Sequence, residues 1–278
     1  MNTRRFGPDD VVPAAEIIRR GGLLGIPTET VYGLGANGLD PEAVANIFAA
    51  KGRPQDNPLI LHIPSSAWLE RYCRNIPDAA YALADRFWPG PLTMILERGD
   101  MVPDVVTAGL DTVGMRCPAH PVCRAILTAA DLPVAAPSGN TSGRPSPTTA
   151  QHMLEDMDGK IDGIVDGGPC TVGVESTIID LTVMPPRLLR PGGVTLEDLR
   201  ETLGEVAVDQ AVRRLMGEGE HPRAPGMKYR HYAPKAPVTV VRGDPARGAD
   251  YIRTHLEEGD GVVCFDEFAG QYPDHVVE

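Results

Sequence analysis

The sequence predicts an α/β protein with a mixed β-sheet. Short apolar segments of strand length alternate along the chain with segments that have helical spacing, and this alternation is typical of the α/β class. Leu59 to Ile63 is an almost continuous apolar run, as expected for a strand that is covered on both faces. Between residues 161 and 190, strand-like segments follow one another without a helix, which favours antiparallel pairing there.

The composition is that of a soluble globular protein with a large core. The chain has 278 residues, of which 42% are hydrophobic and 23% are charged. This length fits one large domain, or one domain together with part of another. The formal net charge of −12 means that the surface as a whole repels nucleic acid and acidic lipid. A site for an anion must therefore be a local basic pocket.

The sequence shows no signal for secretion or for crossing a membrane. Its N-terminus, MNTRRFGPDD, contains no apolar segment, and no apolar run approaches about 18 residues. The five cysteines are odd in number and include no CxxC pair, which argues against a disulfide framework or a zinc site. We therefore expect free thiols in a reducing cytoplasm.

The first half of the chain is predicted to alternate helices and strands. Asp9 and the Asp40-Pro41 pair can begin the first two helices, and Gly21 and Gly52 can end them. The stretch PTETVYGLGANG is predicted to be a loop. In order, the predicted elements are a helix at 9–20, a strand at 23–26, a loop at 27–38, a helix at 40–52, a strand at 59–63, helices at 66–74 and 78–87, and strands at 92–96 and 112–116.

The second half contains a long polar loop. The stretch PSGNTSGRPSPTT, residues 137–149, could be a flexible linker, but apolar elements flank it closely, which favours a binding loop. Thr148 or Thr149 can cap the helix that follows the loop, and Thr195 can cap a later helix. The predicted elements are a helix at 121–130, strands at 133–136, 161–165, 174–180 and 187–190, and a helix at 195–203.

The chain changes character after residue 205. Residues 205–235 are charged and end near HPRAPGMKYRHYAP, and a strand at 237–241, a helix at 249–256 and a strand at 261–265 are predicted to follow. One such β-α-β unit is too small to be a whole domain. We therefore predict three parts: a main domain at 1–205, a linker or lid at 206–236, and at 237–278 a second domain that is incomplete at Glu278.

Two cations and an amide are candidates for binding phosphate. Lys51 and Arg53 end a predicted helix, where they could simply complement the helix dipole. Pro54 and Pro58 frame the following turn, so that the Arg53 guanidinium and the Asn57 amide can point the same way. Because Arg is suited to bidentate contact with phosphate, this frame favours an anion site.

Other polar residues lie within or at the ends of predicted strands. His62 lies in an apolar strand, where a lone histidine is more often a hydrogen-bonded core residue than a catalyst. Thr28, Glu29, Thr30 and Tyr32 follow a strand end, where ligands bind in α/β sheets, although an ordinary turn is the alternative.

The loop at 137–149 is predicted to bind an anion without covalent chemistry. Hydroxyl and backbone N–H groups ahead of a helix make a good anion cradle. The sequence contains neither Walker A nor GxGxxG, and SGNTSG is not the GxSxG turn of a serine hydrolase. The candidate residues are Ser138, Asn140, Thr141, Ser142, Arg144 and Ser146.

Further cations and hydroxyls lie on the remaining strands. Thr112 and Arg116 share one face of a predicted strand, and Ser176 and Arg190 lie at the ends of two others. Each residue alone could have a structural role. Together, several cations at strand ends of an acidic protein predict a pocket for a multiply charged anion.

The segment KYRHYAP has three possible functions. Its cations and tyrosines could contact RNA, could form a lid over a nucleotide, or could belong to a solvated linker. The composition does not discriminate among these three.

Seven blocks of sequence resemble the YrdC-like family. They are PTETVYGLG, KGRPQDNPLILHI, FWPGPLT, VGMRCPAHP, APSGNTSGRPSPT, GVESTIID and LLRPGG, and they occur in this order within residues 8–205. PGMKYRHYAP resembles the linker of the long form of the family, which has an additional C-terminal domain. The resemblance implies an open, twisted α/β sheet around a concave positive pocket. The additional domain would be a small Rossmann-like unit, of which this chain would contain the start.

The resemblance also implies an activity. Members of the family that act as nucleotidyltransferases convert L-threonine, bicarbonate and ATP, with Mg²⁺, to L-threonylcarbamoyladenylate and pyrophosphate. A partner enzyme then transfers the threonylcarbamoyl group to the adenosine beside the anticodon of tRNA. No nucleophilic side chain is needed, because the carbamate of threonine attacks the α-phosphorus and the enzyme contributes positioning and charge neutralisation.

The resemblance assigns roles to the candidate residues and no metal ligand to the protein. Lys51 and Arg53 would be catalytic. The residues expected to hold L-threonine are Thr30, His62, Arg116, Ala136 and Ser176. The residues expected to hold the nucleotide are Arg53, Asn57, Thr112, Ser138, Ser146 and Arg190, with His231 and Tyr232 closing over it as a lid.

Two other functions remain as alternatives. A concave basic surface of this fold could bind double-stranded RNA, although the net charge of −12 argues against it. A carbamoyl-adenylate enzyme is the second alternative, because hydrogenase-maturation carbamoyltransferases contain a similar module. Those proteins also carry zinc-finger-like cysteine patterns, which do not occur in this sequence.

Overall fold

The computed structural model describes residues 2–212, 236–272 and 274–277. The chain divides into two compact units, Met1–Ala233 and Pro234–Glu278. The first unit contains the sheet and every predicted site residue that the structure describes, whereas the second is small.

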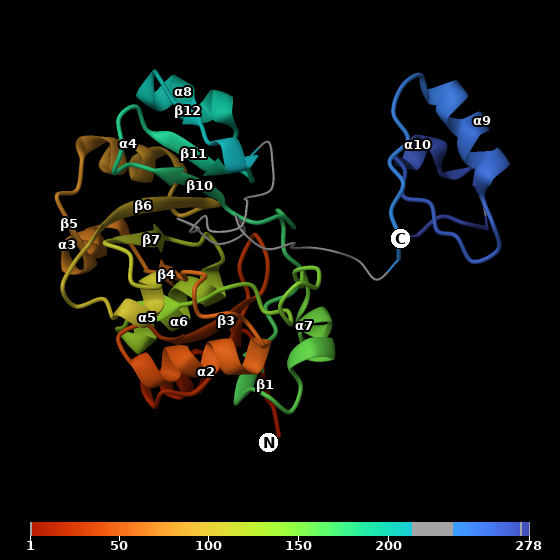
Figure 1. The fold of residues 1–278 in the computed structure, drawn as a ribbon. Helices are drawn as coiled ribbons and strands as arrows, with labels where there is room; N and C mark the ends of the chain where they lie inside the picture. Colours follow the sequence, from red (N-terminus) through yellow and green to blue (C-terminus); the bar gives the residue numbers. More distant parts are fainter. Residues whose placement is uncertain (1, 213–235, 273, 278) are drawn as a thin grey trace. The chain divides into compact units, whose positions relative to one another are not determined.

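A mixed sheet forms the centre of the first unit. Within the described residues its strand order is β1-β9-β2-β3-β8-β4-β7-β6-β10-β11-β12, and β5 pairs with β6. Parallel and antiparallel pairs both occur, which confirms the predicted mixed sheet (Figure 1). The strands are β1 Arg4–Phe6, β2 Leu24–Ile26, β3 Gly33–Asn37, β4 Ile60–His62, β5 Cys73–Arg74, β6 Leu92–Arg98, β7 Thr112–Arg116, β8 Val134–Ala135, β9 Gly163–Val165, β10 Thr177–Asp180, β11 Arg187–Arg190 and β12 Ala207–Val208.

Two hydrophobic clusters cover the sheet. Helices α1 and α6 contribute to one cluster, with Leu24 and Val134 of the sheet. Helices α2, α4, α7 and α8 contribute to the larger cluster, with Leu61 and Met115 of the sheet. The helices of this unit are α1 Val11–Arg19, α2 Pro41–Lys51, α3 Leu69–Tyr72, α4 Asp78–Phe87, α5 Asp104–Thr107, α6 Pro121–Ala130, α7 Ala150–Met157 and α8 Leu196–Leu203, with 3₁₀ turns at Ser66–Trp68 and Gln210–Val212.

Local sequence signals determine several helix ends as predicted. The Asp40 side chain accepts hydrogen bonds from two backbone N–H groups at the start of α2, and Gly52 ends that helix in the left-handed conformation. Thr149 caps α7, and Thr195 forms a capping box with Asp198 at the start of α8. In the described chain, no helix has the length and apolar character needed to cross a membrane.

The predicted loop at 27–38 is wrong in its second part. Gly33–Asn37 forms strand β3, which pairs antiparallel with β2 and with β8. The glycines misled the prediction because Gly is unfavourable in strands. At Gly35 a Cβ atom would lie only 2.9 Å from the Cγ1 atom of Val134, so the close packing of β8 requires glycine there.

The predicted antiparallel region is confirmed in part. Strands β10 and β11 pair antiparallel, with a register shift between Ile178 and Ile179. Strand β9, however, pairs parallel with both β1 and β2, and β10 pairs parallel with β6. The sequence showed neither of these pairings, because the partner strands are far away along the chain.

The second unit contains less regular structure than predicted. Helix α9, Pro245–His255, is present and α10, Asp266–Ala269, follows it. Residues 237–241 form no strand, and within 261–265 only Val262 makes a bridge, to Val276. The small core of this unit contains Ala249, Val262 and Tyr272. Val240 and Val263 remain exposed at 68% and 87%, so within the described part of the chain no layer covers these two side chains.

Candidate active site

A row of residues in register across five strands forms one side of the site. His62 of β4 lies opposite Arg116 of β7, and Arg116 lies opposite Thr93 of β6. Thr93 in turn lies opposite Ile178 of β10, which lies opposite Arg190 of β11. Residues opposite one another on paired strands project from the same face of a sheet. The strand register therefore brings an imidazole and two guanidinium groups from distant parts of the sequence to one face.

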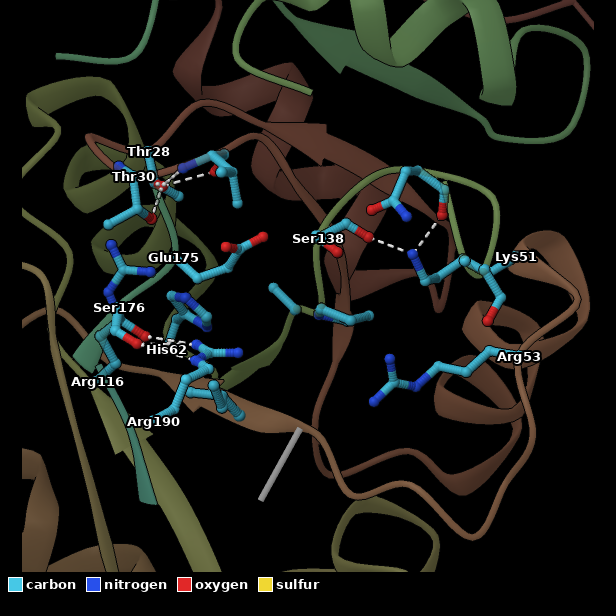
Figure 2. Close-up of a pocket in the computed structure, with 17 residues that line it drawn as sticks. Thr28, Thr30, Lys51, Arg53, His62, Arg116, Ser138, Glu175, Ser176 and Arg190 are labelled. Carbon is cyan, nitrogen blue, oxygen red and sulfur yellow. Dashed lines mark hydrogen bonds between the residues drawn. The ribbon is translucent and has the colours of Figure 1, made fainter. Parts of the chain in front are cut away.

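A pocket lies beside this row. Figure 2 shows cationic side chains on both sides of it, with Arg116 and Arg190 on one side and Lys51 and Arg53 on the other. The residues that line it are Thr28, Thr30, Val31, Lys51, Arg53, Ile60, His62, Arg116, Ala136, Pro137, Ser138, Asn140, Ser142, Gly143, Glu175, Ser176 and Arg190. The structure thus brings together nine of the predicted site residues, in agreement with a pocket for an anion.

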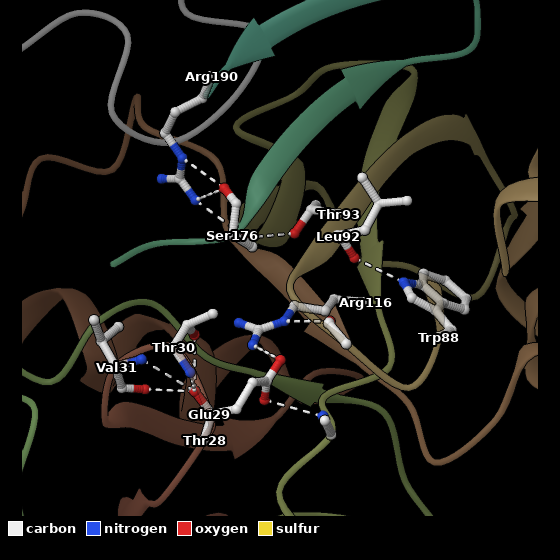
Figure 3. A network of polar contacts seen from close by, with 12 residues as sticks. Thr28, Glu29, Thr30, Val31, Trp88, Leu92, Thr93, Arg116, Ser176 and Arg190 are labelled. Atoms are coloured by element: carbon white, nitrogen blue, oxygen red, sulfur yellow. Dashed lines mark hydrogen bonds and ion pairs between the residues drawn. The ribbon is translucent and has the colours of Figure 1, made fainter. Parts of the chain in front are cut away.

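Arg116 makes a buried ion pair that the sequence analysis did not identify. Its Nη2 atom lies 2.6 Å from the Oε1 atom of Glu29, and both side chains are at least nine-tenths buried (Figure 3). The second carboxylate oxygen of Glu29 accepts a hydrogen bond from the backbone N–H of Ala119 at 3.0 Å. Glu29 therefore fixes the position of the Arg116 guanidinium from below the pocket surface.

Ser176 connects Arg190 to the middle of the sheet. The Arg190 guanidinium donates to the backbone oxygen of Ser176 at 2.9 and 3.1 Å, and to its hydroxyl oxygen at 3.2 Å. The hydroxyl groups of Ser176 and Thr93 lie 2.8 Å apart (Figure 3). Arg190 is therefore oriented by the backbone of the neighbouring strand end, and its charge remains next to the pocket.

The threonine turn after β2 is closed by its own hydroxyl groups. The Thr28 hydroxyl lies 2.9 Å from that of Thr30 and donates to the backbone oxygen of Val31 at 2.7 Å. The Thr28 hydroxyl oxygen also accepts hydrogen bonds from the backbone N–H groups of Thr30 and Val31, both at 3.2 Å. This turn, an ST-type turn, holds Thr30 at the pocket wall.

His62 is an uncharged histidine at neutral pH. The residue is only 2% exposed, and burial, with a smaller effect of the Arg116 charge, lowers the pKa of its imidazole from 6.5 to about 3. Backbone oxygens of Ile60 and Val134 oppose this shift weakly. Its Nδ1 atom is buried without a hydrogen-bond partner among the described residues. An uncharged ring with an available nitrogen is suited to a hydrogen bond with a ligand rather than to electrostatic binding of an anion.

Lys51 holds the polar loop against helix α2. The residue is 2% exposed, and its Nζ atom donates to the backbone oxygens of Ser138 and Asn140. Its own backbone oxygen accepts the N–H of Ser142 at 2.9 Å. Burial, and then the nearby Arg53 charge, lowers the pKa of the Lys51 ammonium to about 7, while Asp156 acts in the opposite direction. One residue thus connects three points of the loop.

A second anchor holds the outer part of the same loop. Asp156 of α7 accepts the backbone N–H of Thr141 at 2.9 Å and forms an ion pair with Arg144. The Asn140 side-chain amide donates to the backbone oxygens of Thr141 and Arg144 at 2.9 and 2.8 Å. These contacts make 138–146 an ordered wall, as the binding-loop interpretation predicted, rather than a linker.

Arg53 and Asn57 occupy the turn after α2. The Arg53 guanidinium donates to the backbone oxygens of Asn57 and Pro58 at 3.4 and 3.2 Å. Asn57 is 1% exposed, and its Oδ1 atom is buried without a hydrogen-bond partner among the described residues. Arg53 lines the pocket, whereas Asn57 lies behind it.

Three predicted residues lie outside the pocket lining, and two cannot be placed. Thr112 shares a face of β7 with Arg116, but four residues of a strand separate them by about 13 Å. Asn57 is buried behind the turn, and Ser146 reaches the pocket through its hydrogen bond to Glu175. His231 and Tyr232 lie outside the described residues.

Glu175 is a site carboxylate that the sequence analysis did not single out, whereas Glu29 was named only as part of the polar turn after a strand. Glu29 lies between two threonines of PTETVYG, and Glu175 directly precedes Ser176 in GVEST. Both were neighbours of predicted binding residues, which was the available signal.

Comparisons with known proteins agree with the predicted resemblance. A family model described as "Telomere recombination" matches residues 16–192, and one described as "Threonylcarbamoyl-AMP synthase, C-terminal domain" matches residues 194–277. The threonylcarbamoyl-AMP synthase of Pyrococcus abyssi (strain GE5 / Orsay) is 54% identical over 246 residues, which are 88% of this chain and 70% of that protein. The threonylcarbamoyl-AMP synthase of Bacillus subtilis (strain 168) is 47% identical over 265 residues, which are 94% of this chain and 76% of that protein.

The fold is also similar to that of a solved structure. The crystal structure of P. abyssi Sua5 complexed with L-threonine has a TM-score of 0.88 and 48% sequence identity. The similarity covers 96% of this chain and 82% of that one. Sequence and fold therefore agree, and the prediction of the long form with a C-terminal domain is confirmed. The chain belongs to the family of threonylcarbamoyl-AMP synthases.

Proposed function

We propose that this protein converts L-threonine, bicarbonate and ATP to L-threonylcarbamoyladenylate and pyrophosphate. The observation that carries the proposal is the pocket, in which the residues expected for threonine and for nucleotide come together in a fold shared with a relative that is complexed with L-threonine. This activity requires both a threonine site and a nucleotide site, and so explains why both groups of residues are present.

The strand side of the pocket is suited to L-threonine. Arg116 is buried and oriented by Glu29, so a guanidinium edge can bind the threonine carboxylate at low entropic cost. His62 is uncharged, and its imidazole can exchange a hydrogen bond with the threonine hydroxyl without attracting a second anion. Thr30, Ser176 and the backbone of Ala136 complete this side.

The loop side is suited to ATP. Arg53, Ser138 and Arg190 line the pocket, and Ser146 stands next to it through Glu175. Asn57 and Thr112 would act from outside the lining, and His231 and Tyr232 would close over the nucleotide. Mg²⁺ would arrive with the phosphates of ATP and supply charge neutralisation, because the described residues contain no cluster of three potential metal ligands.

The chemistry requires positioning more than reactive side chains. The threonine nitrogen adds to CO2 derived from bicarbonate, and the carbamate oxygen attacks the α-phosphorus while pyrophosphate leaves. Arg53 and Arg190 can neutralise negative charge on the phosphates, and Lys51 holds the loop that faces them. A histidine with a pKa of about 3 is a weak proton acceptor, so His62 serves as a hydrogen-bonding residue rather than as a base.

The product implies a second enzyme. A mixed anhydride of a carbamate with AMP is reactive, so an enzyme that transfers the threonylcarbamoyl group to tRNA, at the adenosine beside the anticodon, would consume it. The five unpaired cysteines agree with a location in the cytoplasm.

Release of pyrophosphate tests the proposal. The full chain should release pyrophosphate from ATP only when L-threonine and bicarbonate are both present, and Arg53→Ala and Arg116→Ala should abolish the release. Release without threonine, or no release, would contradict the proposal. Carbamoyl phosphate replacing threonine and bicarbonate would support a carbamoyl-adenylate enzyme, and steeply salt-dependent binding of double-stranded RNA would support an RNA-binding module.

A further inference from the structure

The charges around the pocket single out Glu175. Among the described residues that line the pocket, four are lysine or arginine, and Glu175 is the one carboxylate. Figure 2 shows Glu175 on the strand side, between Thr30 and His62 in the view. Its neighbour in sequence, Ser176, lies at the start of β10 and is one of the residues expected to hold threonine.

Glu175 has no cationic partner in the described structure. Its Oε1 atom accepts a hydrogen bond from the Ser146 hydroxyl at 2.5 Å, and its Oε2 atom has no hydrogen bond to a described residue. Glu29, the other carboxylate of this region, is paired with Arg116 and buried below the surface. A partly buried carboxylate in a cationic pocket, but without an ion pair of its own, is suited to binding a cationic group of a ligand.

The amino-acid substrate has such a group. At neutral pH an α-amino acid carries a carboxylate and an ammonium on the same carbon atom. When the carboxylate binds Arg116, the ammonium must lie nearby, and the other lysine and arginine residues of the lining repel it. Glu175 is the lining side chain that attracts it.

We propose that Glu175 binds the ammonium group of the substrate L-threonine and thereby orients its nitrogen in the pocket. This inference rests on the proposed function, because it requires an amino acid in the pocket. It adds a substrate-binding carboxylate to the residues expected for threonine. It also predicts selectivity for a ligand with a free amino group over a hydroxy acid of the same shape.

Calorimetric titration of the full chain with L-threonine at pH 7 tests the proposal. Glu175→Gln keeps the size and the hydrogen-bonding oxygen but removes the charge, and should weaken threonine binding by at least about tenfold. Glu175→Asp keeps the charge on a shorter side chain and should recover part of the affinity. Glu155→Gln makes the same charge change at an exposed position outside the pocket and should bind threonine like the wild type.

A ligand without the amino group distinguishes two effects of Glu175→Gln: the loss of attraction for the ammonium group, and a general disturbance of the pocket. 2,3-Dihydroxybutyrate replaces the ammonium of threonine by a hydroxyl group. Its affinity should be weaker than that of threonine for the wild type, and Glu175→Gln should change it by less than about threefold.

The outcomes distinguish this inference from the proposed function. Equal threonine affinity of wild type and Glu175→Gln, or equal loss for both ligands, overturns the role of Glu175 while leaving the proposed function in place. A Glu175→Gln variant that binds threonine normally but has lost affinity for ATP with Mg²⁺ also overturns it, and assigns the carboxylate to the nucleotide side. No binding of threonine by the wild type overturns both.

Discussion

The two sides of the pocket are held in place by different means. The strand side consists of His62, Arg116, Ser176 and Arg190, which stand on or beside neighbouring strands of one sheet. The loop side consists of residues 138–143, which lie outside the helices and named strands and are attached to the rest of the protein through Lys51, through Asp156 and through backbone contacts with Tyr32 and Gly33. The first is ordered by strand pairing, and the second by side-chain contacts together with a backbone bridge between Ser138 and Gly33.

This difference determines how each side should respond to a mutation. On the strand side, the backbone ladder remains when one side chain is removed, so the other residues keep their positions. On the loop side, Lys51 donates to the backbone oxygens of both Ser138 and Asn140, so its removal affects two points of the wall at once. We therefore expect a large functional effect from the loop anchor Lys51, and an effect mainly on stability from Glu29, which is buried behind the strand side.

Lys51→Met should give the largest effect. Methionine keeps most of the length of the lysine side chain but has no hydrogen-bond donor, so the backbone oxygens of Ser138 and Asn140 lose their partner and the loop should shift. We expect kcat/KM for ATP, measured by pyrophosphate release, to fall by about 10²- to 10³-fold.

Lys160→Met is the matched control for this loss. The Lys160 side chain is exposed and donates to one backbone oxygen, that of Asp156, at 2.7 Å. The Lys160→Met variant should therefore retain the kcat/KM of the wild type for ATP. A Lys51→Met variant with activity within tenfold of the wild type would show that the loop does not depend on this anchor.

Glu29→Gln should mainly reduce stability. The mutation leaves the buried Arg116 guanidinium without its ionic partner, and breaking a buried pair in this way costs about 3 kcal/mol or more of unfolding free energy. Urea denaturation measures the loss, and titration with L-threonine shows whether Arg116 has also moved.

The control for Glu29 is Glu16→Gln. Glu16 pairs with Arg19 and Arg20 on the exposed surface of α1, so its loss should hardly change the unfolding free energy. Equal stability of the two variants would mean that the Glu29–Arg116 pair does not stabilise the strand side.

Local features of the fold were predictable, whereas long-range features were not. The bounds of β7, α6 and β11 follow from apolar runs and flanking breakers in the sequence, and they agree with the prediction. Strand β3 was missed because its glycines serve close packing that depends on β8, about 100 residues away. Strands at 237–241 and 261–265 were predicted from local sequence, but among the described residues the only pairing in these two ranges is the bridge from Val262 to Val276.

The candidate site shows the same limit. The types and positions of Lys51, Arg116 and Arg190 indicated an anion pocket from the sequence. The in-register row from His62 to Arg190 could not be predicted, because strand order is a property of the whole sheet. The burial of Lys51, and its use as a loop anchor, also depend on contacts nearly 90 residues apart along the chain, which sequence spacing does not reveal.

The smallest effect is a pH dependence of stability on the strand side. Because burial lowers the pKa of His62 to about 3, the unfolded chain, in which the pKa is near 6.5, takes up the proton first as the pH falls. The contribution is complete above pH 6.5 and decreases as the pH falls toward 3, by at most about 1.4 kcal/mol per pH unit. His62→Gln, which cannot titrate, should therefore lose about 2 kcal/mol less unfolding free energy than the wild type between pH 7 and pH 5.

Urea denaturation at both pH values measures this difference, and His152→Gln, at an exposed position of α7, should lose as much as the wild type. An equal loss in wild type and His62→Gln would mean that His62 is hydrated or ion-paired in solution, and the strand side would then be less rigid than its strand pairing implies.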